Sequence, residues 1–161
     1  MYYSYLQSPI GPLLLSGSSN ELHGLYFSTG KKARGADHSW ERADEPFLRV
    51  KKQLKEYFAG ERKRFDLPLA PVGTDFQLSV LRALQEIPFG ETRSYLEIAE
   101  RIGNPKAVRA VGSANGNNPI ALIIPCHRVI GSNGSLTGFG GGIDAKRFLL
   151  ELESSRSGLW A

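Results

Sequence analysis

The chain has 161 residues, a net charge of +4 and a hydrophobic fraction of 41%, which suits one ordinary globular domain or two small ones. No apolar run reaches membrane-spanning length, and the first residues lack the basic and apolar segments of a secretion signal. We therefore expect a protein that is neither secreted nor anchored and that has no membrane partner.

The first part of the chain is predicted to be a small α+β unit. Short apolar runs predict strands at residues 2–6, 13–16 and 22–27. Apolar residues then recur every three or four positions over residues 45–58, which indicates a helix that Gly60 ends. Residues 65–69 have the composition of a further, returning strand.

A stretch that contains proline and glycine, residues 67–73, has the composition of a linker. We therefore expect two domains, at residues 1–73 and 74–161. The first carries eleven basic against eight acidic residues, and the second carries nine against eight. Because neither is a basic block, any contact with DNA has to come from the local placement of cations.

The second domain is predicted to be mostly helical. Thr74 with Gln77, and Ser94 with Glu97, have the spacing of capping boxes, so each pair marks the start of a helix. The helix that Ser94 opens is expected to stop at Gly103, because glycine adopts the backbone conformation that ends helices.

A third helix of this domain is expected to be capped by Asn104, with Pro105 at its first position, and to run to about residue 116. With the helix before it, this segment has the outline of a helix-turn-helix. A last helix is expected after Asp144, with an inner face of three apolar residues: Phe148, Leu149 and Leu152. The predicted fold class is α+β, a three-stranded sheet with one helix followed by a mostly helical domain.

The single cysteine, Cys126, lies in the run Pro125-Cys126-His127-Arg128, after an apolar strand expected at residues 120–124. A lone thiol forms no internal disulfide and favours a reducing compartment, and no histidine pair has zinc-site spacing, so no metal site is expected. Composition alone favours a buried, inert cysteine. The adjacent His127 and Arg128 favour a nucleophile, which needs a base because a free thiol is mostly protonated at neutral pH. Residues on a strand alternate faces, so His127 can serve only if the backbone turns at Cys126 or if a water bridges the two side chains.

The predicted third helix has almost no side-chain bulk on much of its surface, where small residues gather: Ala107, Ala110, Gly112, Ser113 and Ala114. A base-reading helix normally carries Arg, Asn or Gln. This helix suits close docking on a DNA backbone or a shallow groove without sequence readout. Tight packing against another helix explains the same residues equally well.

A glycine-rich segment spans residues 131–142 and lacks the Gly-Lys-Ser/Thr ending of a phosphate-binding loop. Its backbone could close on a flat ligand, with Phe139 available to stack. The alternative is an ordinary surface loop.

Four stretches together carry a family resemblance: residues 90–95, 103–112, 118–119 and 124–129. They closely resemble the O6-alkylguanine-DNA alkyltransferases, also called methylated-DNA–protein-cysteine methyltransferases. The likeness is near-continuous from Thr74 to Glu153 and weak before it, where the chain is similar to the variable N-terminal domain of that family. It implies an RNase H-like N-terminal domain and a C-terminal domain with a winged-helix or helix-turn-helix motif.

The resemblance implies DNA repair by direct reversal. A damaged guanine would be flipped out of the duplex, and Cys126 would take the alkyl group from its O6 atom in a single turnover, as a methylated-DNA–protein-cysteine S-methyltransferase without metal or organic cofactor. The implied partner is double-stranded DNA, bound through the minor groove without sequence specificity by a monomer. The implied location is the cytoplasm, at the nucleoid of a bacterium or archaeon, or the nucleus of a eukaryote.

The resemblance also assigns catalytic roles by position. Cys126 is the acceptor, and His127 acts as its base through a water and is held by Glu153, in the nucleophile–base–orienter arrangement of catalytic triads. Asn118 steadies the turn before Cys126. Tyr95 donates toward the guanine ring nitrogen as charge develops there.

Two further sets of residues are implied by the same resemblance. The extruded base would be held by Val129, Phe139, Gly140 and Gly141. DNA would be contacted by Ser94, Lys106, Ala107, Val108, Arg109, Ala110, Gly112 and Ser113. Arg109 would enter the base stack in place of the extruded nucleotide and offset the cost of unstacking.

Three departures from relatives bear on substrate range: Gly140 stands where some have Ser, Phe139 where others have Tyr, and Ala121 where some have Pro. Whether O4-alkylthymine is also repaired stays open.

Two other functions are compatible with the residues. A helix-turn-helix regulator would need base-reading side chains on the small-faced helix, and a Cys-His-Glu thiol hydrolase would leave Arg109 without a role.

Overall fold

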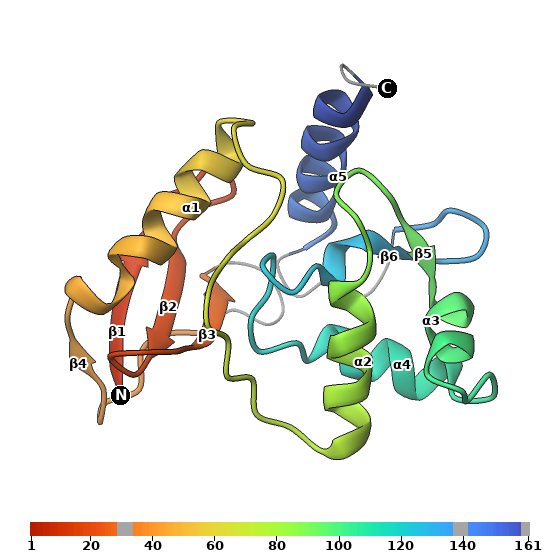
Figure 1. Cartoon of the computed structure of the whole chain (residues 1–161), viewed down its shortest axis with the longest axis horizontal. Helices are drawn as coiled ribbons and strands as arrows, with labels where there is room; N and C mark the ends of the chain where they lie inside the picture. The colour runs from red at the N-terminus through yellow and green to blue at the C-terminus, as the bar shows by residue number, and fades with distance from the viewer. Residues whose placement is uncertain (29–33, 137–141, 159–161) are drawn as a thin grey trace.

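The computed structural model describes residues 1–28, 34–136 and 142–158 (Figure 1). Its N-terminal part is a sheet with one helix, and its C-terminal part is mostly helical. The chain that connects them, residues 59–74, runs between the two parts (Figure 1). Within the described residues, no helix has the length and apolar character that crossing a membrane requires.

The sheet has four strands rather than the expected three. β1 (Tyr2–Leu6), β2 (Leu13–Gly17) and β3 (Leu22–Phe27) match the prediction and pair antiparallel. The fourth, β4 (Glu41–Arg42), pairs parallel with β1 and completes the order β3-β2-β1-β4. Two exposed charged residues carry no strand pattern, so this edge strand has no signal in the sequence.

A helix covers this sheet, and its inner face follows the predicted period. A 3-10 turn, η1 (Glu45–Phe47), leads into α1 (Leu48–Phe58). Three α1 residues, Val50, Leu54 and Tyr57, are buried in one core with the strand leucines. Burying such side chains contributes roughly 1.5–3 kcal/mol each, which holds α1 on the sheet.

Residues 65–69 do not form the strand that was expected. Only Leu69 makes a bridge, to Leu22 at the start of β3. Leu22 donates to the carbonyl of Pro68 and accepts from Ala70. Pro68 has no N–H to continue a ladder, so the pairing ends after one bridge.

Both predicted capping boxes are present. Gln77 N donates to Thr74 Oγ1 (3.1 Å) and Thr74 N to Gln77 Oε1 (2.9 Å), at the start of α2 (Asp75–Gln85). Ser94 and Glu97 make the same pair of bonds, at 3.1 and 3.0 Å, and open α3 (Tyr95–Arg101). These local signals were readable because both partners lie within one turn of chain.

The next helix, α4 (Val108–Gly116), begins three residues later than expected, and Asn104 does not cap it. Asn104 instead starts a turn that ends with Ala107 N donating to its carbonyl (3.0 Å). Asn followed by Pro suits the first two positions of such a turn as well as it suits a helix start, which is why the sequence was misread. α3 and α4 still pack against each other across the bend at Gly103.

The apolar run at residues 120–124 is a tight turn rather than a strand. Ile124 N donates to Ile120 O (3.0 Å), and Leu122 has a φ of +69°, which is uncommon for a residue with a Cβ. Ile120 pairs with Leu25 of β3, so this turn joins the two parts of the molecule. Because the run is buried throughout, its apolar residues carry no periodicity that distinguishes a strand from a turn.

The chain closes with a short sheet and a long helix. β5 (Arg93–Ser94) pairs parallel with β6 (Val129–Ile130), and α5 (Ile143–Gly158) follows. Of the predicted inner face of α5, Leu149 is fully buried and Leu152 is half-buried, but Phe148 is 37% exposed. Two charged residues, Lys146 and Glu153, are buried instead. A charged side chain on an inner face cannot be foreseen from hydrophobic period alone.

Candidate active site

The backbone turns at Cys126, which is one of the two conditions under which His127 was expected to serve this thiol. η2 (Cys126–Arg128) is one turn of 3-10 helix, closed by Arg128 N donating to Pro125 O (3.0 Å). Successive residues of such a turn point in different directions. All of Cys126, His127 and Arg128 are buried, and His127 has no exposed surface. Polar side chains with so little exposure need partners inside the protein.

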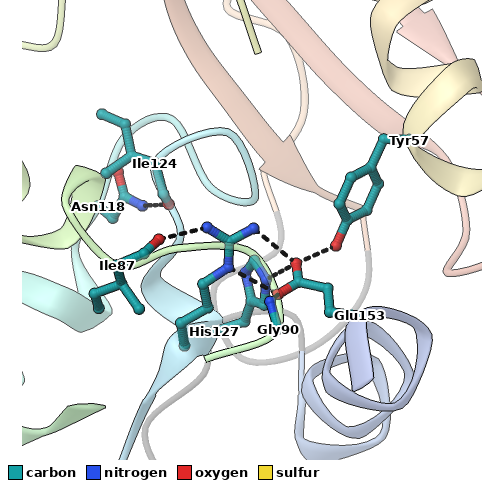
Figure 2. Close-up of polar contacts among 8 residues, drawn as sticks. Tyr57, Ile87, Gly90, Asn118, Ile124, His127 and Glu153 are labelled. Carbon is teal, nitrogen blue, oxygen red and sulfur yellow. Dashed lines mark hydrogen bonds and ion pairs between the residues drawn. The ribbon is translucent and has the colours of Figure 1, made fainter. Parts of the chain in front are cut away.

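Glu153, on the inner face of α5, supplies those partners. Its Oε2 accepts from His127 Nε2 (2.7 Å), from Tyr57 Oη (2.6 Å) and from Arg128 Nη2 (3.0 Å). Its Oε1 accepts from Arg128 Nε (2.8 Å) and from the Gly90 N–H (3.4 Å). Figure 2 shows Tyr57, His127 and Gly90 converging on this carboxylate. Four segments that are distant in sequence therefore meet at one buried charge.

The carboxyl of Glu153 is ionised. Burial by itself would raise its pKa, but the hydrogen bonds and charges of His127 and Arg128 hold the pKa well below its ordinary value. An ionised carboxylate only accepts hydrogen bonds, so the proton of the neutral His127 ring lies on Nε2. Nδ1 then carries the lone pair.

His127 Nδ1 is buried and has no hydrogen-bond partner among the described residues. Burial lowers the pKa of His127, and Glu153 offsets that effect only in part. The ring is therefore neutral at pH 7, with an unsatisfied acceptor next to the Cys126 turn. Unpartnered buried polar atoms are rare in native proteins, and this one is suited to accept a proton.

The Cys126 thiol is protonated in this resting state. Burial raises its pKa, while the Asn118 side chain and the charge of Lys146 act in the opposite direction. Asn118 also fixes the turn before the thiol, because its Nδ2 donates to Ile124 O (2.7 Å) and its Oδ1 accepts from Ile120 N (3.0 Å) (Figure 2). The thiol is therefore held in place but needs a base to become a nucleophile.

Three residues of this site were given no specific role from the sequence. Arg128 neutralises Glu153 and donates through Nη1 to Ile87 O (2.8 Å). Lys146 has no exposed surface, and its Nζ donates to Val129 O (2.5 Å). Burial lowers the pKa of Lys146 to about 8, against the opposing effect of Cys126. Tyr57 belongs to the N-terminal part. The sequence marked Arg128 because a charged residue there directly follows an apolar run and a Cys-His pair. No comparable pattern marked Lys146 or Tyr57.

The remaining predicted residues differ in how far they are exposed. Tyr95 begins α3 and is half-buried, with its ring facing Gly112 of α4. Most of the predicted DNA-facing side chains are exposed on or just before α4: Lys106, Val108, Arg109, Ala110 and Ser113. Ala107, Gly112 and Ser94 are half-buried, and the Ser94 hydroxyl caps α3. Phe139, Gly140 and Gly141 lie outside the described residues.

Both parts of the chain match models of one protein family. Residues 1–71 match the ribonuclease-like domain of 6-O-methylguanine DNA methyltransferase, and residues 75–155 match its DNA-binding domain. The chain is 58% identical over 155 residues to the methylated-DNA–protein-cysteine methyltransferase of Methanosarcina acetivorans, covering 96% of this chain and 99% of that one. It is 53% identical over 157 residues to the Mycobacterium tuberculosis protein of the same name, covering 98% and 94%.

Solved structures agree with these sequence matches. The crystal structure of Mycobacterium tuberculosis OGT in complex with DNA superposes with a TM-score of 0.92 at 52% identity, covering 97% of this chain and 94% of that one. The O6-methylguanine-DNA methyltransferase of Pyrococcus kodakaraensis has a TM-score of 0.65 at 22% identity, covering 94% and 98%, and shares the fold.

Replacing Glu153 with glutamine is expected to lower the free energy of unfolding at pH 7 by about 3 kcal/mol, because the amide leaves the buried Arg128 charge uncompensated. The folded-state pKa of Glu153 lies below its ordinary value of 4.5. Its stabilising contribution is therefore complete above that pH and is lost as the pH falls below it. Urea unfolding at pH 7 and pH 4 should show a smaller difference from wild type at pH 4.

The matched control is Glu151→Gln, at an exposed position of the same helix, which should leave stability within about 0.5 kcal/mol of wild type. An equal loss for Glu153→Gln at both pH values would contradict the ionised, paired carboxylate.

Lys146→Met is expected to slow the alkylation of Cys126 by iodoacetamide, because it removes the nearby positive charge that lowers the thiol pKa. We expect a rate about three- to tenfold lower at pH 8, with the pH profile moved to higher pH. Arg147→Met, at an exposed position one residue on, is the control. Identical profiles for Lys146→Met and wild type would show that this ammonium does not act on the thiol.

Proposed function

Because the chain belongs to the methylated-DNA–protein-cysteine methyltransferase family, we propose that it repairs DNA by direct reversal and moves the alkyl group of O6-alkylguanine onto Cys126. The observation that carries the proposal is the neutral His127, which follows the buried Cys126 in η2, is held by Glu153 through Nε2 and has an unpartnered Nδ1. A nucleophile that reacts only once has to stay protonated until its substrate binds, and it then needs a base to remove the proton.

The proposed transfer is a displacement at carbon. His127 Nδ1 takes the proton of Cys126 through one water, and the thiolate attacks the alkyl carbon. The S–C bond forms while the C–O6 bond breaks, and its electron pair passes to the guanine. Tyr95 supplies the proton that the ring nitrogen gains, so unmodified guanine leaves. The thioether product is stable, and each molecule therefore acts once.

Several contacts support the proposed pocket for the flipped base. Val129 belongs to β6, directly after the Cys126 turn, and its carbonyl is fixed by Lys146. This carbonyl and that of Cys126 would accept from the exocyclic amine of guanine. Asn115 Nδ2 donates to Cys126 O (3.3 Å), which orients the second carbonyl. Phe139, Gly140 and Gly141 remain assigned to the same pocket by resemblance.

The DNA-binding surface is proposed to be α4 with the turn before it. Ala110 and Ser113 are exposed and Ala107 and Gly112 are half-buried, so this face of the helix could approach a minor groove closely without reading sequence. Ala114, which was expected on the same face, is buried. Arg109 is the exposed long cationic side chain of α4 itself, and it would fill the place of the extruded nucleotide. A side chain that replaces a base in the stack offsets part of the few kcal/mol that unstacking costs.

The organisation of the protein is part of the same proposal. We place the domain boundary between residues 73 and 74, in the chain that leads from the sheet to the Thr74 cap of α2. We further propose that the protein acts as a monomer in the cytoplasm, at the nucleoid of a bacterial or archaeal cell. O4-alkylthymine is an additional candidate substrate.

Mixing the protein with a duplex that contains O6-methylguanine should add one methyl group to Cys126 and no more. Intact-protein mass spectrometry followed by peptide mapping measures this gain. Cys126→Ala should show none, because the acceptor atom is missing. No mass gain in the wild type, with an active family member reacting in parallel, would refute the proposed function.

Arg109→Ala should slow transfer from duplex DNA about tenfold or more, because nothing then offsets the unstacking of the flipped base. Transfer from the free base O6-benzylguanine should change less than twofold. Arg101→Ala, at an exposed position on α3, serves as the control for lost positive charge. An equal effect of Arg109→Ala on both substrates would count against insertion into the stack.

A further inference from the structure

Tyr57 brings the N-terminal part of the protein into direct contact with the catalytic carboxylate. It lies in the last turn of α1, its side chain is 1% exposed, and its Oη lies 2.6 Å from Oε2 of Glu153, which is 96 residues later in the chain. The ring is held by edge contacts with Phe58 and Phe89 and by a tilted contact with Phe65. Figure 2 shows the phenol reaching from α1 to the carboxylate.

The phenol must be the donor in this contact. Burial and the Glu153 charge raise the pKa of Tyr57 far above its ordinary value, and an ionised carboxylate can only accept. Oε2 is the same oxygen that accepts from His127 Nε2. The Tyr57 proton therefore fixes where Oε2 sits and withdraws negative charge from the atom that holds the base.

We propose that Tyr57 is a positioning residue for alkyl transfer, which sets the orientation and the basicity of His127 through Glu153. This inference rests on the proposed function. It gives the N-terminal domain a defined part in the chemistry, one hydrogen bond away from the base, separate from any contact with DNA.

The electrostatic consequence has a definite sign. The charged groups that act on His127 are Glu153 and Lys146 from α5 and Arg128 from η2, and Tyr57 acts on it from α1 through Glu153. Removing the Tyr57 hydroxyl leaves more negative charge on Oε2, which favours the protonated imidazole. His127 must be neutral to accept a proton, so the reaction should lose rate on the acid side of its pH profile.

The experiment measures single-turnover transfer from an O6-methylguanine duplex between pH 5 and 9, for wild type and Tyr57→Phe. On the acidic side of the pH–rate profile, the pH at which the rate of the variant falls should be higher than in wild type by about 0.5–1 pH unit. Transfer by the variant is then roughly three- to tenfold slower at pH 5 and close to wild type at pH 8–9. NMR titration of the His127 ring should show its pKa raised by the same amount.

Two further variants separate this role from a structural one. Tyr5→Phe removes a phenol from β1 and should leave the profile unchanged. Replacing Tyr57 by 3,5-difluorotyrosine keeps the ring and provides a stronger hydrogen-bond donor. The His127 pKa, and the pH at which the transfer rate falls on the acidic side, should then both be lower than in wild type. That variant also tests the inference if Tyr57→Phe fails to fold.

A Tyr57→Phe profile that superposes on wild type, or that is lower by one constant factor at every pH, would overturn the inference. A wild-type protein that transfers no methyl group at all would refute the proposed function instead. In that case the NMR titration of His127 still decides whether Tyr57 controls the base.

Discussion

The buried carboxylate of Glu153 is the constraint on which the rest of the site depends. It accepts hydrogen bonds from Tyr57, Gly90, His127 and Arg128, which lie on three segments distant from its own helix. A buried ion is tolerated only when such partners compensate its lost hydration. α1, the loop before β5, the Cys126 turn and α5 are therefore tied together at one charge.

This arrangement keeps the nucleophile inactive until it is needed. Burial holds Cys126 protonated, and the neighbouring His127 is neutral and lacks a partner at Nδ1 within the described residues. An ionised thiol would react with any small electrophile in the cell, and a protein that reacts once has no means to recover. In the proposed mechanism, a protonated thiol and a neutral His127 confine the chemistry to the moment when a substrate is bound.

The sequence predicted local elements well where both partners of an interaction lie within one turn. The capping boxes at Thr74 and Ser94 are examples, as is the need for a turn at Cys126. It failed where one local pattern serves two structures. Asn104 followed by Pro suits a turn or a helix start, and the apolar run at residues 120–124 suits a strand or a buried turn.

The sequence by itself determined the family, the reactive cysteine, its histidine neighbour and the small-faced helix, because these are fixed by residues close together in the chain. Only the tertiary structure decided that Tyr57 of α1 would reach Glu153 of α5, and that Lys146 would be buried against Val129. Such pairs follow from how elements that are distant in the chain pack against one another. The packing depends on shape and charge summed over many distant residues, which no local pattern contains.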